Sequence, residues 1–168
     1  MFSQTVEYAL RAIVTIAQHD GQPRTAQQIS KLAQVPGPYL SKMMQGLARS
    51  GLVNSQRGLH GGFVLAKAAK ELTVWEVMEA VDPMQRIHVC PLGLKSHAKT
   101  LCPLHRRLDN AMAHVEEQFK NTTIAELLSE PGSVTPLCEQ QQVMNIDTCH
   151  AVKKSPGDRH ASKTAVTK

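Results

Sequence analysis

The sequence predicts a mainly α-helical fold with one small β-hairpin. Helical periodicity of apolar residues, or a helix-capping signature, marks six segments before residue 132. Two short apolar runs on either side of a glycine-rich stretch predict one hairpin. These observations together favour a helical domain that carries a small wing-like ribbon.

Three helices are expected in the first fifty residues. Residues 2–19 place their apolar side chains on one face, which predicts an amphipathic helix ended by Asp20-Gly21. Thr25 and Gln28 have the spacing of a capping box, which begins a helix through Ala33. After the break at Pro36-Gly37, residues 38–50 predict a helix that buries four apolar side chains: Leu40, Met43, Met44 and Leu47.

The hairpin comes next. Residues 52–55 and 63–65 are expected to form its strands, and residues 56–62 its glycine-rich turn. Thr73 and Glu76 then cap a helix through Ala80. Two helices, a tight turn and a glycine-rich hairpin are the pattern of a winged helix-turn-helix.

The second half predicts a long helix. Residues 103–120 place five positions on one apolar stripe: Leu104, Leu108, Ala111/Met112, Val115 and Phe119. Thr123 and Glu126 cap a last short helix. We divide the chain into a winged helix-turn-helix domain (1–81), a cofactor or sensor loop (82–103), a dimerisation and terminal-helix region (103–130) and a disordered tail (131–168).

Charge is unevenly distributed along the chain. The 168 residues have a formal net charge of +5, but residues 21–70 contain seven Lys and Arg and no Asp or Glu. Such a stretch is typical of a surface that meets phosphates. Without a membrane-spanning run or a signal peptide, a cytoplasmic protein with no membrane partner is expected. No nucleophile–base pair, phosphate-binding glycine loop or paired carboxylates indicate an enzyme.

Within a winged helix-turn-helix, the helix at 38–50 would enter the major groove and the wing would reach a minor groove or a phosphate. For Tyr39 a packing role is an equal alternative, and Lys42 favours a phosphate contact. The candidate DNA-binding residues are Thr25, Gln28, Pro38, Tyr39, Ser41, Lys42, Arg49, Arg57, Gly58, Gly61 and Gly62.

Cysteine and histidine gather between residues 88 and 105. Thiolates at Cys90 and Cys102 and the imidazole of His105 could surround one iron–sulfur cluster. With His97 they could instead form a tetrahedral zinc site. A metal-free domain with ordinary or thiol-switching cysteines is the third alternative.

Residues 2–128 resemble the IscR/NsrR family of bacterial winged-helix regulators. The resemblance is carried by YALRAIVTIA, by QQISKLAQVPGPYLSKMMQGLARSGLVNSQRGLHGGFVLAK and by TVWEVMEAVD, and most specifically by Arg57-Gly58-x-x-Gly61-Gly62-Phe63. It implies a homodimer joined through the long helix and bound to a two-fold operator in double-stranded DNA. A helix facing its own domain would show the same apolar stripe.

The resemblance also implies a cluster held by three loop cysteines and completed by a histidine or an acidic residue of the first helix. Cys90 and Cys102 match the first and third cysteines, whereas Ser96 stands near the expected place of the second. The implied ligands are Cys90, Cys102, His105 and Glu7 of the partner subunit, with His97 less favoured. Mixed ligation suits a 2Fe–2S centre better than a 4Fe–4S one.

The sequence therefore predicts a sequence-specific DNA-binding transcriptional regulator. The expected form is a homodimeric repressor whose operator binding depends on an iron–sulfur cluster that senses nitric oxide, redox state or iron. The alternative is a cofactor-free or zinc-binding winged-helix regulator controlled by a protein partner or by thiol oxidation.

Overall fold

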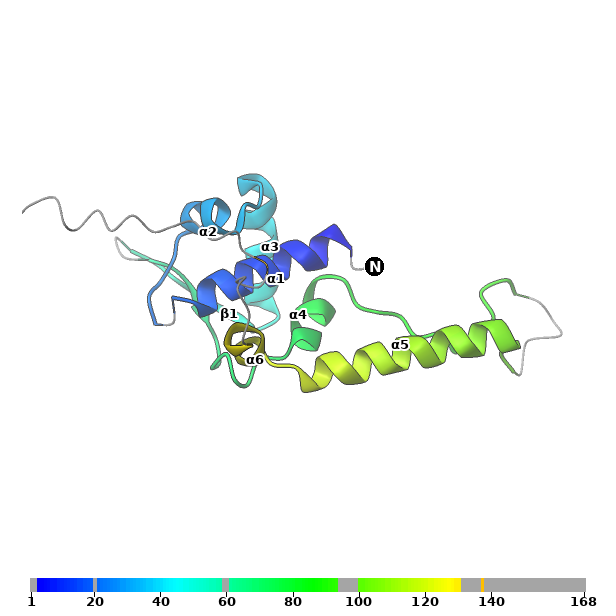
Figure 1. The fold of residues 1–168 in the computed structure, drawn as a ribbon. Coiled ribbons are helices and arrows are strands. Elements are labelled where there is room, and N and C mark those ends of the chain that lie inside the picture. Colours follow the sequence, from blue (N-terminus) through cyan, green and yellow to red (C-terminus); the bar gives the residue numbers. More distant parts are fainter. Residues whose placement is uncertain (1–2, 20, 59–60, 94–99, 131–136, 138–168) are drawn as a thin grey trace, which may run out of the picture.

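The computed structural model describes residues 3–19, 21–58, 61–93, 100–130 and 137. It has six helices and one hairpin in these residues, so the expected fold class is confirmed. A rounded head carries most elements, and α5 extends from it as an arm (Figure 1). The elements are α1 (Gln4–Ala17), α2 (Ala26–Ala33), α3 (Gly37–Arg49), β1 (Val53–Gln56), β2 (Gly62–Leu65), α4 (Val74–Val81), α5 (Pro103–Asn121) and α6 (Ile124–Ser129).

Helix α1 is the centre of the head. It contacts α2, α4, β2 and α6, and its residues from Ala12 to Ala17 are all buried. The apolar face that the sequence predicts is buried, and in the second half of the helix small and β-branched side chains let neighbours pack on the other faces as well. Thr15, the one buried polar residue in the part of the chain that the structure describes, donates its hydroxyl hydrogen to the carbonyl of Arg11 at 2.8 Å.

Capping boxes begin three of the helices, as their spacing predicts. In each, a threonine hydroxyl accepts from the backbone N–H three residues later, and the side chain at that position accepts from the threonine's own N–H. Each pair satisfies two backbone donors that the first helical turn leaves unpaired. The pairs are Thr25 with Gln28, Thr73 with Glu76, and Thr123 with Glu126.

The hairpin is tied to the helices by a third chain segment. Strands β1 and β2 are antiparallel, with Val53 opposite Leu65 and Gln56 opposite Gly62. Phe63 of β2 also exchanges two backbone hydrogen bonds with Arg24, at 2.8 and 3.1 Å, just before α2. The wing is therefore fixed to the start of the helix-turn-helix.

The arm has little burial of its own. None of the residues of α5 is buried. Residues 82–93 lie alongside it and run from the head toward the tip of the arm, opposite in direction to α5 (Figure 1). The inner face of α5 walls a groove of about 810 Å³ together with Val6, Met78 and Met84. Among the described residues, no helix has the length and apolarity that crossing a membrane would require.

Candidate nucleic-acid interface and metal-ligand cluster

A tight turn joins α2 to α3. Gln34 adopts the left-handed conformation, with φ of 54°, and ends α2. The hydroxyl of Ser30 donates to the carbonyl of Val35 at 2.6 Å, and Gly37 then begins α3. These contacts fix the angle between the two helices, which is what presents the N-terminal end of α3 to DNA in a helix-turn-helix.

Two of the candidate base-contacting residues are exposed at that end of α3. Ser41 and Lys42 both face solvent. The Ser41 hydroxyl donates to the carbonyl of Gly37 at 3.1 Å, within its own helix. A hydroxyl can turn from such a local bond toward a base or a phosphate. Exposed Pro38 precedes them, and Arg49 is exposed at the other end of the helix.

Tyr39 of α3 contacts two residues of α1. Its hydroxyl donates to the Oγ1 atom of Thr5 at 2.7 Å, and its ring meets that of Tyr8 edge-on, with centroids 5.5 Å apart. The ring is still 38% exposed. These contacts favour the packing role over base contact, because using the hydroxyl on DNA would break the bond to Thr5.

The wing glycines are required by the hairpin itself. Gly58 has φ of 112°, a conformation that disfavours any side chain. A Cβ on Gly61 would lie 2.4 Å from the carbonyl oxygen of Gln56, and one on Gly62 would lie 2.5 Å from the backbone of Arg24. Arg57 is exposed at the turn, whereas Leu59 and His60 lie outside the described residues.

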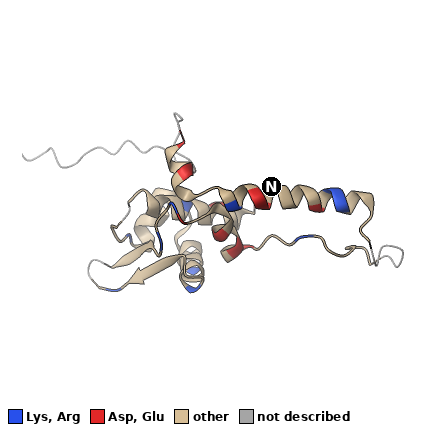
Figure 2. Ribbon diagram, turned by 90° about the horizontal axis from the view of Figure 1, so that it is seen from below, with Lys and Arg blue, Asp and Glu red and all other residues tan. Residues whose placement is uncertain are grey.

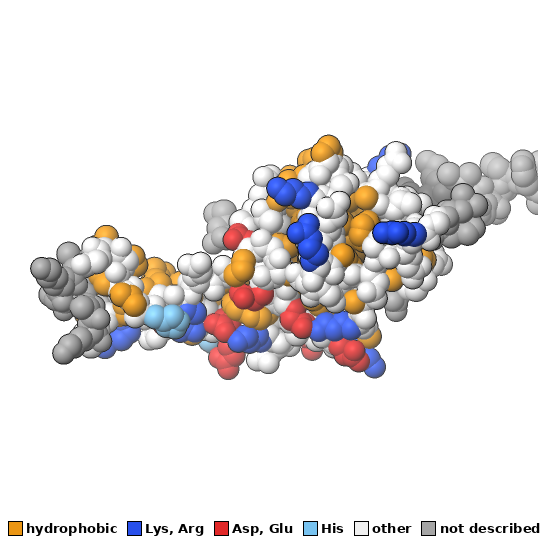
Figure 3. Space-filling model, turned by 180° about the vertical axis from the view of Figure 1, so that it is seen from behind, with side chains coloured by type: hydrophobic (Ala, Val, Ile, Leu, Met, Phe, Trp, Pro, Cys, Tyr) orange, Lys and Arg blue, Asp and Glu red, His pale blue; other side chains and the backbone are white. Residues whose placement is uncertain are grey.

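The basic stretch is nearly free of acidic partners. Within the part of the chain that the structure describes, only Lys67 of its seven Lys and Arg forms an ion pair, with Glu76 at 2.5 Å. Basic side chains stand apart on the upper head in Figure 3, whereas acidic and basic ones alternate below. Figure 2 shows blue positions on the ribbon of the hairpin and red ones near the junction with α5. Unpaired cations are available to phosphates.

The proposed ligands gather at the far end of the arm. The sulfur of Cys102 lies 3.4 Å from the Nδ1 atom of His105, and the sulfur of Cys90 lies 3.9 Å from the same atom. Cys90 is 5% exposed. Pro103 begins α5 just after Cys102, so His105 stands in the first turn of the helix beside that thiol. His97 lies outside the described residues.

Glu7 is held elsewhere. It accepts from Arg11 at 2.6 Å on the surface of α1. Among the described residues, no three Cys, His, Asp or Glu side chains form a group that could hold a metal ion. Two cysteine sulfurs, which are soft donors as thiolates, and an imidazole, which is a borderline donor, nevertheless suit iron or zinc. The donor chemistry of Cys90, Cys102 and His105 therefore fits such a group, but these three form an incomplete ligand set.

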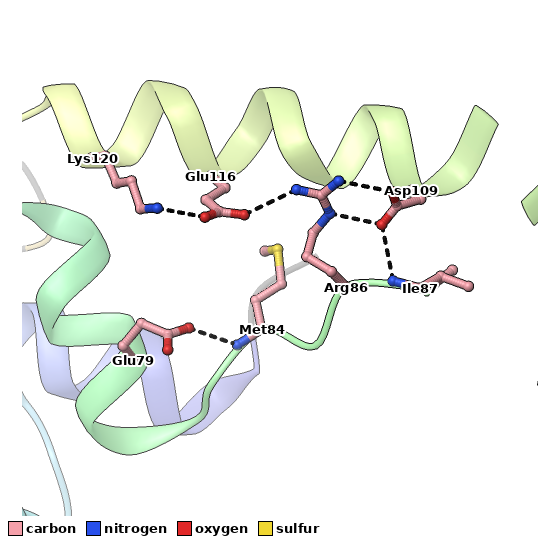
Figure 4. Close-up of polar contacts among 7 residues, drawn as sticks. All are labelled: Glu79, Met84, Arg86, Ile87, Asp109, Glu116 and Lys120. Atoms are coloured by element: carbon pink, nitrogen blue, oxygen red, sulfur yellow. Dashed lines mark hydrogen bonds and ion pairs between the residues drawn. The ribbon is translucent and has the colours of Figure 1, made fainter. Parts of the chain in front are cut away.

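The sequence did not predict one group of ion pairs, which is centred on Arg86. Arg86 donates to both carboxylate oxygens of Asp109 at 2.7 Å, and to Glu116 at 3.2 Å (Figure 4). The hydrogen bonds from Arg86, with a further one from the Ile87 N–H, lower the pKa of Asp109 to about 2. The seven-residue spacing of Asp109 and Glu116, which puts both on one helical face, was the available signal.

This fold and this charge distribution define a winged-helix DNA-binding regulator. Residues 2–130 match the model of the Rrf2 family, described as an iron-dependent transcriptional regulator. The chain belongs to the Rrf2 family. It is 31% identical over 132 residues to a protein of Aquifex aeolicus (strain VF5) named as an HTH-type transcriptional regulator, covering 77% of this chain and 92% of that one. These are regulators, so the chain is not an enzyme, as predicted.

Two solved structures share the fold. One is CymR, the global cysteine regulator of B. subtilis, with a TM-score of 0.64 and 23% identity over 79% of this chain and 98% of that one. The other is IscR of T. potens, with a TM-score of 0.64 and 23% identity over 76% and 85% of the two chains. At this identity the likeness concerns the fold alone.

Proposed function

We propose that the protein is a homodimeric, sequence-specific repressor whose operator binding is controlled by an iron–sulfur cluster. The observation that carries this proposal is the convergence of Cys90 and Cys102 on one nitrogen of His105, at the end of an arm that projects from a DNA-binding head. A cluster bound there would supply one-electron redox chemistry and iron-centred reactivity toward nitric oxide.

The ligand set we propose is mixed. Cys90, Cys102 and His105 come from one subunit, and Glu7 comes from the partner. His97 is the less favoured substitute. Glu7 would have to leave Arg11, an exchange that a partly exposed ion pair permits at low cost. Because a carboxylate and an imidazole donate less charge than thiolates, this set favours a 2Fe–2S centre over a 4Fe–4S one.

Dimerisation through α5 is supported by its apolar stripe. Leu104, Leu108 and Val115 are 70%, 49% and 36% exposed, an arrangement that one chain alone leaves in contact with water. A second α5 would cover them. Val115→Glu is therefore expected to give a monomer by sedimentation, whereas Gln118→Glu, on the same helix but off the stripe, should leave the dimer intact. A monomeric unsubstituted protein would contradict the proposal.

The DNA contacts we propose are divided between two elements. Ser41 and Lys42 at the N-terminal end of α3 would enter the major groove, and Arg57 would reach a phosphate or the minor groove beside the wing. Arg57→Ala should weaken binding at every sequence and reduce the salt slope by about one phosphate contact. Arg107→Ala, on the arm, is the control that should leave binding unchanged.

The cluster is tested by purification without oxygen from iron-replete cells. Iron, acid-labile sulfide and a visible charge-transfer spectrum are expected in the unsubstituted protein and in His114→Ala, an exposed histidine of the same helix. They should be lost in Cys90→Ser and His105→Ala. A colourless protein that contains zinc would favour the zinc-binding alternative. A metal-free protein whose DNA binding responds to thiol oxidants would favour the cofactor-free one.

A further inference from the structure

We propose that Arg86 is a positioning residue that holds Cys90 against Cys102 and His105 through its ion pair with Asp109. The inference rests on the proposed function in one respect, namely that the three side chains are ligands. It adds a residue outside that ligand set, because Arg86 lies four residues before Cys90 on the segment that faces α5 in Figure 4.

The carboxylate of Asp109 holds the segment before Cys90 at two points, the Arg86 side chain and the backbone of Ile87. The guanidinium of Arg86 spans both oxygens of the Asp109 carboxylate, each at 2.7 Å, and the Ile87 N–H donates to one of them at 2.9 Å. A side chain and a neighbouring backbone group thus bind one carboxylate. Such a forked, charge-assisted contact sets orientation as well as distance. Sliding the segment along α5 would break all three hydrogen bonds.

The same register continues to the ligands. Asp109 follows His105 by four residues, so both lie on one face of α5, one turn apart. Cys90 follows Arg86 by four residues on the segment that runs the opposite way. Fixing Arg86 on Asp109 therefore limits how far Cys90 can move from His105, and the Cys90 sulfur lies 3.9 Å from Nδ1. A one-residue slip would carry the thiol about 3.3 Å along the helix.

Neighbouring charges hold Arg86 in place without competing for Cys90. Glu116 accepts from Arg86 at 3.2 Å and from Lys120 at 2.5 Å, so it is shared between two cations. Asp109 keeps its charge at any pH near neutrality, since its pKa is lowered to about 2 by the hydrogen bonds from Arg86 and from the backbone of Ile87. The contact therefore keeps both charges throughout the pH range near neutrality.

The first test follows the Cys90 thiol in metal-free, reduced full-length protein. Alkylation by iodoacetamide is followed at each cysteine by peptide mass spectrometry. Cys90 is buried, and Arg86→Gln and Asp109→Asn should each speed its alkylation by about threefold, the size expected for a partly exposed ion pair. The double variant should add little to either single one. Arg107→Gln, an exposed arginine of α5, is the matched control and should change nothing.

The second test uses cobalt(II) as the probe. Thiolate-to-cobalt charge-transfer absorption reports binding through the cysteines. Arg86→Gln should weaken it by about threefold, the factor expected for losing the same ion pair, while Arg107→Gln should bind like the unsubstituted protein. Thermal melting of each variant shows whether the fold is kept. Alkylation of Cys90 that is equally slow in Arg86→Gln and in the control would overturn the proposal.

The two proposals fail separately. If the unsubstituted protein shows no thiolate–cobalt absorption, or Cys90→Ser retains it, the proposed ligand set is wrong, and the alkylation rates still decide the role of Arg86. If cobalt binds through Cys90 but Arg86→Gln binds it equally well, the ligand set stands and the positioning role is overturned.

Discussion

Replacing Gly62 with alanine should detach the wing from the helix-turn-helix. The added Cβ would lie 2.5, 2.6 and 2.8 Å from the C, O and N atoms of Arg24. These are backbone atoms, which cannot turn away as the end of a flexible side chain would. Because ordinary carbon contacts lie at about 3.5–4.0 Å, β2 and the segment before α2 must separate by about 1 Å.

That separation determines the cost. Phe63 and Arg24 exchange hydrogen bonds of 2.8 and 3.1 Å, and lengthening either by 1 Å takes it beyond the bonding range of about 3.2 Å. Two hydrogen bonds at about 1 kcal/mol each, or overpacking at about 1–3 kcal/mol, give the same expectation. We expect Gly62→Ala to lower the free energy of unfolding by about 1–3 kcal/mol.

Urea unfolding followed by circular dichroism measures this loss. Gly46→Ala is the matched control, since a Cβ there meets nothing within 4 Å and the position is inside α3. Alanine in a helix interior should stabilise the protein by about 0.5–1 kcal/mol. The same glycine-to-alanine substitution should thus lower the free energy of unfolding at Gly62 and raise it at Gly46. DNA affinity, measured by fluorescence anisotropy, should fall for Gly62→Ala under conditions where the variant is fully folded.

An unfolding midpoint for Gly62→Ala equal to or above that of the unsubstituted protein would refute the reasoning. It would mean that the wing relaxes without loss, and that Arg24 and Phe63 do not hold it. Loss of stability with unchanged DNA affinity would instead keep the packing argument and remove the wing from the DNA contacts.

Three further outcomes are expected. Met44→Ala should cost about 2–5 kcal/mol in urea unfolding, because the side chain is fully buried and its loss leaves a cavity. Thr25→Ala, which removes the cap of α2, should cost about 0.5–2 kcal/mol in the same assay. The pKa of Asp109 is about 2 in the folded chain against an ordinary 3.8, so its stabilisation is present above pH 3.8 and is lost as the pH falls toward 2. Asp109→Asn should therefore unfold less steeply with falling pH in that window, as followed by circular dichroism, and an identical acid transition would contradict this.

Local chemistry explains why so much of the fold could be predicted from the sequence. A capping box needs only a threonine and a Glu or Gln three residues later, and all three predicted boxes are present. The glycine-rich turn likewise predicts the hairpin, and the helical period of apolar residues predicts α5. The helical period does not tell how many sides of a helix are covered, and the second half of α1 is buried on all of them.

The candidate site was less predictable for the same reason. The contact between Tyr39 and Thr5 joins residues 34 positions apart, and that between Arg86 and Asp109 joins residues 23 apart. No local pattern specifies which distant partner a side chain meets. Cysteine and histidine spacing did indicate three side chains that lie close together, Cys90, Cys102 and His105, because chemistry restricts which residues can share a metal.

The contacts of α5 with the head determine which elements move when the far end of α5 is displaced. Its C-terminal end is fixed to the first turn of α4, through the hydrogen bond from the Val74 N–H to the Thr122 carbonyl and through Lys120, which lies 5.4 Å from the ring centre of Trp75. The helix that follows is held to the segment between β2 and α4, by the hydrogen bond from the Ala125 N–H to the Ala69 carbonyl. A helix of 19 residues is about 28 Å long. A small rotation at its C-terminal attachment therefore accompanies a large displacement of its N-terminal end, beside Cys102 and His105. Because α4 also contacts α3, a reorientation of α5 has a direct path through α4 to the helix that carries Ser41 and Lys42.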